Sequence, residues 1–192
     1  MLVNVAIFVS GNGTNCESII RYFENSQFVN ISLVLSNKKD AYALVRANKF
    51  NVPTEVLSKK EINDPDILLN LLKKYNVDFI VLAGFLLMIP EFLIEAFSKK
   101  IINLHPALLP KFGGKGMYGH FVHEAVKAAG ETQTGFTVHY VSPVCDGGEI
   151  IEQYKIDIDE NDSVEDIAKK ENSLELKFFP LVIERVIKKH FS

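Results

Sequence analysis

The chain has 192 residues, of which 47% are apolar and 23% are charged, and its formal net charge at pH 7 is −3. This is the composition of an ordinary globular protein, and the small net charge gives no reason to expect a nucleic acid or an anionic membrane as partner. No apolar run approaches the roughly 18 residues of a membrane span, and two cysteines are too few for a disulfide framework. We therefore expect a cytoplasmic protein, a monomer or a homodimer, whose partners are small molecules.

Short apolar runs alternate with amphipathic runs along the first 105 residues. The apolar runs, at residues 2–9, 31–36, 79–83 and 101–104, are typical of parallel strands covered on both faces. The amphipathic runs predict helices near residues 15–24, 42–48, 65–75 and 90–97. In the third, a buried face is predicted for Ile67, Leu68, Leu71, Leu72 and Tyr75. The alternation favours an α/β fold with a doubly wound, mostly parallel, Rossmann-like sheet.

The pattern changes after residue 130. Two strands are expected at residues 136–141 and 150–158, joined by a turn around Asp146-Gly147-Gly148, and they predict an antiparallel C-terminal portion of the sheet. A last helix is expected over residues 163–190. Pro180 lies inside it, so we expect a kink there or two shorter helices. We interpret residues 1–192 as one domain.

A glycine loop follows the first strand and opens the first helix, with the sequence Ser10-Gly11-Asn12-Gly13-Thr14-Asn15. The free N–H groups of a helix start bind phosphate, although a plain tight turn would also explain the glycines. A dinucleotide site would need a third glycine where Cys16 stands, and an acidic residue where the second strand ends in Ser36-Asn37-Lys38. A single phosphate monoester therefore fits better than a dinucleotide.

The strand at residues 101–104 runs into an Asn-x-His-Pro element. Residues two apart on a strand point to the same side, so Asn103 and His105 are expected to face one pocket at the carboxyl end of the sheet. An amide and an imidazole can stabilise an oxygen that gains negative charge, and the imidazole can also move protons. A lone histidine is more often structural, but the paired spacing favours acyl-transfer chemistry.

The Asp146-Gly147-Gly148 sequence has two interpretations. It is either a simple hairpin turn or the source of a carboxylate that orients His105 and favours its charged form. The sequence alone does not place Asp146 beside His105.

The order of these elements resembles that of the folate-dependent formyltransferases over essentially the whole chain, most closely the branch that formylates glycinamide ribonucleotide in purine synthesis. The motifs that carry the resemblance are the glycine loop, Leu82-Ala83-Gly84-Phe85, Asn103-Leu104-His105-Pro106-Ala107-Leu108-Leu109-Pro110 and Asp146-Gly147-Gly148. The resemblance implies transfer of a formyl group from 10-formyltetrahydrofolate, as co-substrate, to the amine of 5'-phosphoribosylglycinamide. It implies no metal and no covalent intermediate.

The same resemblance assigns roles to individual residues. Asn103 and His105 would polarise the formyl oxygen, Asp146 would orient His105 and tune its pKa, and Glu175 would contact the ribonucleotide. The remaining residues would hold the two substrates: Gly11, Asn12, Gly13, Thr14 and Asn15 the phosphate, and Phe85, Leu86, Leu87, Met88, Ile89, Ser142, Pro143, Val144, Cys145 and Asp146 the folate. Residues 1–100 would then form a phosphate-binding half, and residues 101–192 a half with the catalytic and folate-binding elements.

Two segments depart from the family pattern. The stretch from residue 112 to 119 contains four glycines and is longer than the compact form of this loop, so we expect a mobile lid over the site. The stretch from residue 58 to 64 is short, which leaves Lys59 or Lys60 to meet the glutamate tail of the folate.

Several other readings compete with this one. A formyltetrahydrofolate deformylase would share Asn103, His105 and Asp146 but carry a domain ahead of the catalytic one, and a methionyl-tRNA formyltransferase would carry one after it. A non-catalytic phosphate-binding module is the rival from another class. A Cys145 nucleophile lacks further support, and a zinc site at His105, His120, His123 and Cys145 lacks a Cys-x-x-Cys or His-Glu-x-x-His pattern. His139 is interpreted as a packed, supporting residue or one that faces the site.

Overall fold

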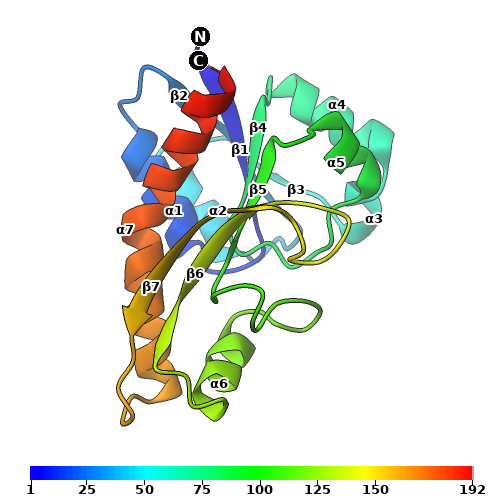
Figure 1. Cartoon of the computed structure of the whole chain (residues 1–192). Coiled ribbons are helices and arrows are strands. Elements are labelled where there is room, and N and C mark those ends of the chain that lie inside the picture. Colours follow the sequence, from blue (N-terminus) through cyan, green and yellow to red (C-terminus); the bar gives the residue numbers. More distant parts are fainter. Residues whose placement is uncertain (192) are drawn as a thin grey trace.

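A seven-stranded sheet runs through the centre of the molecule (Figure 1). The computed structural model describes residues 1–191. The strands are β1 (Val3–Val9), β2 (Val29–Ser36), β3 (Thr54–Val56), β4 (Phe79–Leu82), β5 (Ile101–His105), β6 (Gln133–Tyr140) and β7 (Ile150–Asp157), in the spatial order β3-β2-β1-β4-β5-β6-β7. The first five pair in parallel, whereas β6 is antiparallel to β5 and β7 to β6. The predicted α/β fold with an antiparallel C-terminal portion is confirmed.

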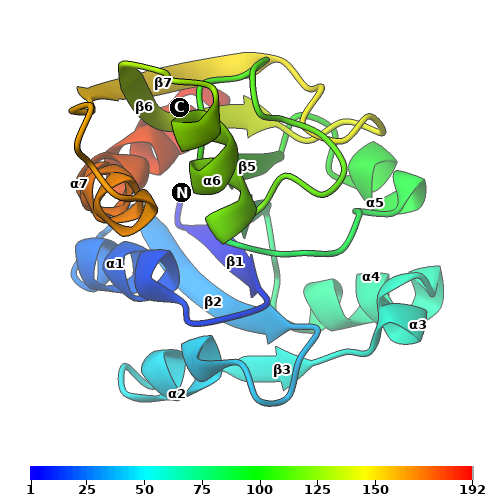
Figure 2. The ribbon, with the colours of Figure 1, turned by 90° about the horizontal axis from the view of Figure 1, so that it is seen from below.

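Helices cover both faces of the sheet (Figures 1 and 2). One face packs against α1 (Thr14–Phe23), α2 (Tyr42–Asn48) and α7 (Val164–Phe191). The other packs against α3 (Lys59–Ile62), α4 (Pro65–Lys74) and α5 (Glu91–Ala96). The remaining helix, α6 (His120–Ala128), lies beyond the end of the sheet and packs with α7 around a small third cluster.

The two faces explain the uninterrupted apolar runs in the sequence. In β1, Val5 and Ile7 point into the core on the α1 side, while Ala6 and Phe8 point into the core on the α4 side. All four residues are completely buried. A strand that is covered on both faces has no solvent-facing side and therefore shows no polar alternation.

Some local expectations are wrong. Ile67 is 42% exposed, because Leu68 and Leu72, one turn apart, form the line of α4 that meets the sheet, and Ile67 lies about 100° around the helix from Leu68. Three further elements, β3, α3 and α6, are not predicted by the apolar patterns of the sequence. These three elements have three, four and nine residues, and β3 lies at an edge of the sheet, so their apolar patterns are short.

The last helix continues through Pro180, so the alternative of two shorter helices is wrong. A proline has no N–H to give to the carbonyl four residues earlier, which here belongs to Leu176. That carbonyl accepts instead from the hydroxyl of Ser18 on α1, over 2.8 Å. The break in the helix ladder is therefore satisfied from a neighbouring helix, and it ties α1 to α7.

Candidate active site

The loops that follow β1 and β4 are joined at the carboxyl end of the sheet. The backbone N–H of Ser10 donates to the carbonyl of Gly84 over 3.1 Å, and the N–H of Leu86 donates to the hydroxyl oxygen of Ser10 over 2.9 Å. β1 and β5 flank β4 in parallel, so the ends of all three strands lie at one edge. The glycine loop, the segment after β4 and the Asn-x-His element therefore meet there, as the fold predicts.

Asn103 on β5 lies opposite His139 on β6. The side-chain nitrogen of Asn103 and Nε2 of His139 are 3.1 Å apart, and Nδ1 of His139 is 2.9 Å from the carbonyl oxygen of Tyr140. A carbonyl only accepts, so Nδ1 carries a proton, and an amide nitrogen only donates, so Nε2 is the acceptor of the Asn103 amide. The second hydrogen of that amide remains free to donate to a ligand.

His105 is buried at the end of β5 and is held at both ring nitrogens. Its Nε2 lies 2.7 Å from the carbonyl oxygen of Phe112, and its Nδ1 lies 3.5 Å from Oδ2 of Asp146. Since the carbonyl can only accept, Nε2 carries a proton and is the donor that points toward the loop after β5. The imidazole is therefore fixed in one orientation.

Asp146 lies in the turn between β6 and β7 and reaches both histidines. Its Oδ1 is 3.6 Å from Nε2 of His139, and its Oδ2 accepts from the backbone N–H of Gly114 over 2.9 Å. Its φ of 52° is in the left-handed region. The turn can close on itself because the next residues are glycines: a Cβ at Gly148 would lie 1.7 Å from the carbonyl oxygen of Tyr140.

The surroundings of the two central groups favour the neutral form of His105 and the ionised form of Asp146. Burial lowers the pKa of His105, while Asp146 and the Phe112 carbonyl act in the other direction. Burial acts to raise the pKa of Asp146, but His139, the Gly114 N–H and the nearby His105 bring it below its ordinary value. At neutral pH the pair is a carboxylate beside an imidazole that is poised to take a proton at Nδ1.

The glycine loop is shaped by close contact with α2. Gly13 is the N-cap of α1, has a φ of 76°, and leaves the helix start without a side-chain cap. A Cβ at this position would lie 2.4 Å from the Cβ of Ala43. Only glycine meets both demands, so the N–H groups at the start of α1 stay open to a ligand.

The first and last helices meet beside this loop. The side-chain amide of Asn15 on α1 donates to Oε2 of Glu175 on α7 over 2.7 Å. The amide of Asn172 donates to the same oxygen over 3.2 Å. The structure thus brings Asn15 and Glu175, predicted separately as phosphate and ribonucleotide contacts, into direct contact.

The residues predicted to bind folate divide into two groups. Phe85 and Ile89 are buried in the sheet core, and Phe85 packs edge-on against Phe8 with ring centroids 5.4 Å apart. Leu86, Met88 and Val144 are exposed, as are Tyr118 and Phe121 near the loop after β5. Of the other residues predicted to bind folate, Pro143 is exposed, and Leu87 after β4 and Ser142 and Cys145 before Asp146 are half-buried.

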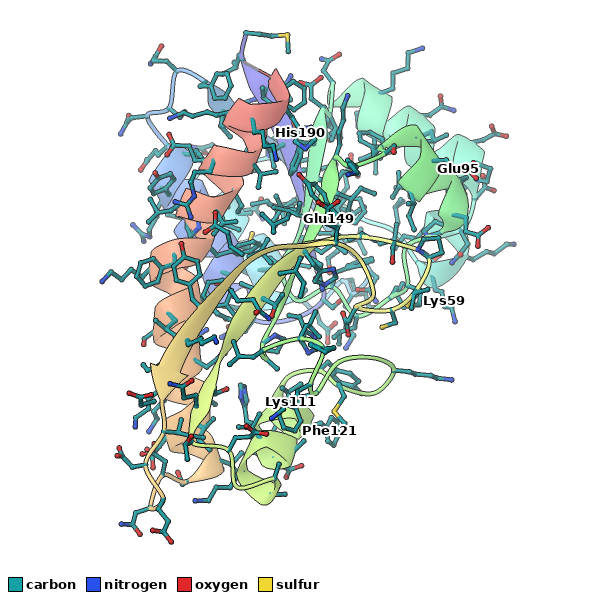
Figure 3. All side chains as sticks on the ribbon, in the orientation of Figure 1. Lys59, Glu95, Lys111, Phe121, Glu149 and His190 are labelled. Carbon is teal, nitrogen blue, oxygen red and sulfur yellow. The ribbon has the colours of Figure 1, made fainter. Side chains whose placement is uncertain are left out.

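The loop before α6 is the segment expected to act as a lid. Figure 3 labels Lys111 at its start and Phe121 on α6 just after it. The loop contacts the site through the carbonyl of Phe112 and the N–H of Gly114, as described above. Figure 3 also places Lys59 on α3, where it is exposed.

The structure does not favour the two rival chemistries. Burial and the adjacent Asp146 raise the pKa of the Cys145 thiol, which disfavours the nucleophilic thiolate. His120 is exposed and 3.1 Å from Glu124, whereas His123 is buried, so the two do not share an accessible helix face. Within residues 1–191 no three His, Cys, Asp or Glu side chains are grouped in a way that could hold a metal ion.

No described helix has the length and apolar character needed to cross a membrane.

Sequence reasoning missed or left open some residues of this site. His139 lies between Asn103 and Asp146 and is only 2% exposed, so it is a packed residue that supports two of the predicted site residues. Thr137, not singled out before, donates to the carbonyl of Ala107 over 2.7 Å and accepts from the N–H of Leu109 over 3.0 Å. The available signal was period-two spacing, since Thr137 and His139 alternate along β6 as Asn103 and His105 do along β5.

Comparison with known proteins agrees with this arrangement. A sequence model described as "Formyl transferase" matches residues 3–183. Over 93% of its length the chain is 40% identical to the chloroplastic phosphoribosylglycinamide formyltransferase of Arabidopsis thaliana, and it spans 63% of that protein. Over 94% of its length it is 36% identical to the phosphoribosylglycinamide formyltransferase of Haemophilus influenzae, and it spans 85% of that protein.

A solved structure is similar to this chain over nearly its whole length. The crystal structure of phosphoribosylglycinamide formyltransferase from Anaplasma phagocytophilum superposes with a TM-score of 0.89 and 32% identity, covering 98% of this chain and 89% of that one. The two chains therefore share the same overall fold over nearly the whole length of this chain. With a match that runs from β1 into α7, the chain belongs to the formyl transferase family.

Proposed function

We propose that this protein transfers the formyl group of 10-formyltetrahydrofolate to the amine of 5'-phosphoribosylglycinamide, in purine synthesis. Its relatives from Arabidopsis thaliana and Haemophilus influenzae carry the name of that activity. The observation that supports the proposal most is the cluster of two buried histidines, His105 and His139, with the half-buried Asn103 and Asp146 at the carboxyl end of the sheet. It combines two hydrogen-bond donors with a carboxylate and lacks an activated nucleophile.

The chain's own residues account for direct acyl transfer. The transfer breaks the bond between the formyl carbon and the folate nitrogen; the amine loses a proton and the folate nitrogen gains one, so that tetrahydrofolate leaves. As the substrate amine attacks the formyl carbon, negative charge develops on the formyl oxygen. The free amide hydrogen of Asn103 and the Nε2 proton of His105 are the donors that would stabilise this charge, the latter once the Phe112 carbonyl has moved aside. Asp146 favours the imidazolium form of His105 and so helps it to hold or release a proton.

The glycine loop and the end of α7 would hold the ribonucleotide. The open N–H groups at the start of α1 suit the phosphate, and the Glu175 carboxylate beside Asn15 suits the hydroxyls of the ribose. The α1 helix brings both contacts to the same end of the sheet as His105. This separation of anchoring from chemistry lets the enzyme align the amine without a covalent intermediate.

The exposed apolar side chains would meet the flat ring of the folate. Leu86 and Met88 follow β4, and Val144 lies two residues before Asp146, so both segments flank the polar cluster. Such exposure of large apolar groups beside buried polar ones is typical of a ligand site. The folate supplies the formyl group, and the chain supplies its orientation.

The test is a release assay with purified protein. Glycinamide ribonucleotide and 10-formyltetrahydrofolate are mixed with it, and loss of the formyl group from the folate is followed by absorbance. Release that depends on the ribonucleotide is the expected result. Release in a control without the ribonucleotide would indicate a deformylase instead, and no release in either tube would overturn the proposal.

A further inference from the structure

A pair of buried carboxyl groups lies on α7 beside the glycine loop. Glu171 and Glu175 are one helical turn apart on the same side of α7 and are 2% and 5% exposed. Two carboxylates that are buried side by side repel each other, which favours a proton on one of them. With that proton the pair can form a hydrogen bond, since a carboxylate oxygen only accepts and a protonated carboxyl group donates.

The surroundings identify Glu171 as the protonated member. Glu175 accepts from the amides of Asn15 and Asn172, whereas within residues 1–191 no donor reaches Oε1 of Glu171. Burial and the charge of Glu175 raise the pKa of Glu171 well above its ordinary value. Burial raises the pKa of Glu175 as well, but the hydrogen bonds that it accepts oppose the shift. Glu175 is thus the carboxylate of the pair.

The neighbouring elements contribute no compensating cation. From α1 the pair meets Asn15, and Ser18 nearby is engaged with the Leu176 carbonyl. On α7 itself, Lys170 forms ion pairs with two aspartates in the turn before the helix. In the described part of the chain, no lysine, arginine or histidine forms an ion pair with either glutamate. The Glu175 carboxylate is therefore held by its contact with the Glu171 carboxyl group and by hydrogen bonds from the amides of Asn15 and Asn172.

Stability alone gives no reason for an acid at position 171. An apolar side chain would fill the same buried space without desolvating a carboxyl group and without leaving one oxygen unpartnered. The feature that an apolar side chain would not supply is a donor aimed at Glu175. That donor acts at the point where α7 meets the glycine loop.

We propose that Glu171 is a positioning residue for the ribonucleotide: its proton, shared with Glu175, fixes the Glu175 carboxylate beside Asn15 as the acceptor for the ribose hydroxyls. This inference rests on the proposed function only in taking a ribose phosphate as the ligand. A carboxylate that turned away or became protonated would lose its capacity to accept from both hydroxyls, so loss of the Glu171 donor weakens ribose recognition.

The decisive comparison is between two variants of Glu171. Glu171→Gln keeps a neutral donor of the same shape, and Glu171→Leu removes the donor but fills the space. Binding of ribose 5-phosphate to the purified full-length protein is measured by calorimetry. We expect Glu171→Leu to raise Kd about tenfold and Glu171→Gln to change it less than about threefold, as for loss or retention of one hydrogen bond to a charged group. Glu165→Leu, the same exchange at an exposed position of α7, is the matched control.

A second ligand separates positioning from general damage. With 2-deoxyribose 5-phosphate one hydroxyl is missing, so wild-type protein should bind more weakly and the difference between wild type and Glu171→Leu should shrink. Equal penalties for both sugars would mean that Glu171 supports the fold rather than the hydroxyl contact, and would overturn the proposal. Each variant is first checked for wild-type circular dichroism, with Glu171→Met replacing Glu171→Leu if the latter does not fold.

Kinetics give an independent readout. Glu171→Leu should raise KM for glycinamide ribonucleotide about tenfold while KM for the folate and kcat stay unchanged. If wild-type protein does not transfer the formyl group, the proposed function fails, but the calorimetry still decides the role of Glu171. Wild-type binding by Glu171→Leu, an equal loss in Glu171→Gln, or no binding of ribose 5-phosphate to wild type would each refute the proposal.

Discussion

His105 is held by a backbone carbonyl at one ring nitrogen and faces a carboxylate at the other, which makes its role open to direct test. We expect His105→Ala and Asp146→Asn each to lower kcat by about 100-fold or more, the usual size of a lost proton-transfer or oxyanion contact, with little change in ribonucleotide affinity. Steady-state kinetics and calorimetry measure the two effects. His120→Ala, on the exposed side of α6, is the control. A variant with near-normal kcat would remove that residue from the proposed mechanism.

Gly13 allows a second test at the level of a single residue. Gly13→Ala places a methyl group against Ala43 and strains a left-handed backbone, so the start of α1 must move. We expect a rise in KM for the ribonucleotide of about tenfold or more, with KM for the folate less affected. Gly130→Ala is the matched control, because Gly130 also has positive φ (65°) but open space around it. Equal effects of the two changes would assign the loss to backbone strain alone.

The sequence predicts part of the site and leaves the rest undetermined for a physical reason. Asn103 and His105 share one side of a strand, and period-two spacing is enough to place them together. Asp146 approaches them only because β6 and β7 fold back as a hairpin, which a one-dimensional pattern does not encode. His139 and Glu171 were left open or missed because a buried polar residue in an apolar run shows its partner only after the chain has folded.

The junction of α1 and α7 depends on a hydrogen bond that exists because of Pro180. We expect Ser18→Ala to lower the free energy of unfolding by about 1 kcal/mol, since the Leu176 carbonyl then loses its partner in a partly buried interface. In a Pro180→Ala background the backbone N–H at position 180 donates to that carbonyl, so the same Ser18 change should cost much less. Urea denaturation of the four proteins of this double-mutant cycle measures the difference. Additive effects would contradict the assignment.

The loop after β5 is an element whose contacts, rather than its length, define its part in the site. The Phe112 carbonyl accepts a hydrogen bond from Nε2–H of His105, and the Gly114 N–H donates one to Oδ2 of Asp146. Both groups are the ones that the proposed mechanism needs. In this arrangement the loop satisfies the hydrogen bonds of both groups, and on the proposed mechanism a bound formyl oxygen has to replace the Phe112 carbonyl.

At the scale of the whole molecule, the long central strands follow from the sequence more readily than the short elements at the edges of the fold do. Long apolar runs such as β1 and β2 are predicted well because burial on both faces leaves no alternative pattern. The three-residue β3 is stabilised by pairing with β2, and α6 is stabilised by packing with α7. The local sequence of either element is therefore not enough to predict it. The same tertiary contact lets α7 continue through Pro180, against its local preference.

The buried carboxyl pair makes the stability of the whole protein depend on pH. In the folded state the pKa of Glu171 is raised by burial, whereas in the unfolded chain it returns to an ordinary value of about 4.5. Above that value the unfolded chain releases a proton that the folded protein keeps, so this group's contribution to stability falls as pH rises toward the folded pKa. Glu171→Gln removes the effect. The stability of this variant relative to wild type should therefore grow between pH 4.5 and pH 7, as measured by urea denaturation, and a constant difference would refute the protonation assigned to Glu171.

The contact between Asn15 and Glu175 joins residues that are 160 positions apart. A ribosome makes the glycine loop first and α7 last, and at the usual rate of synthesis the interval between them is on the order of 10 s. During that time the nascent chain has a phosphate loop but not the carboxylate beside it. On the proposed function, a growing or truncated chain does not withdraw the ribonucleotide from solution, and binding begins only when the last helix has been made and has docked on the first.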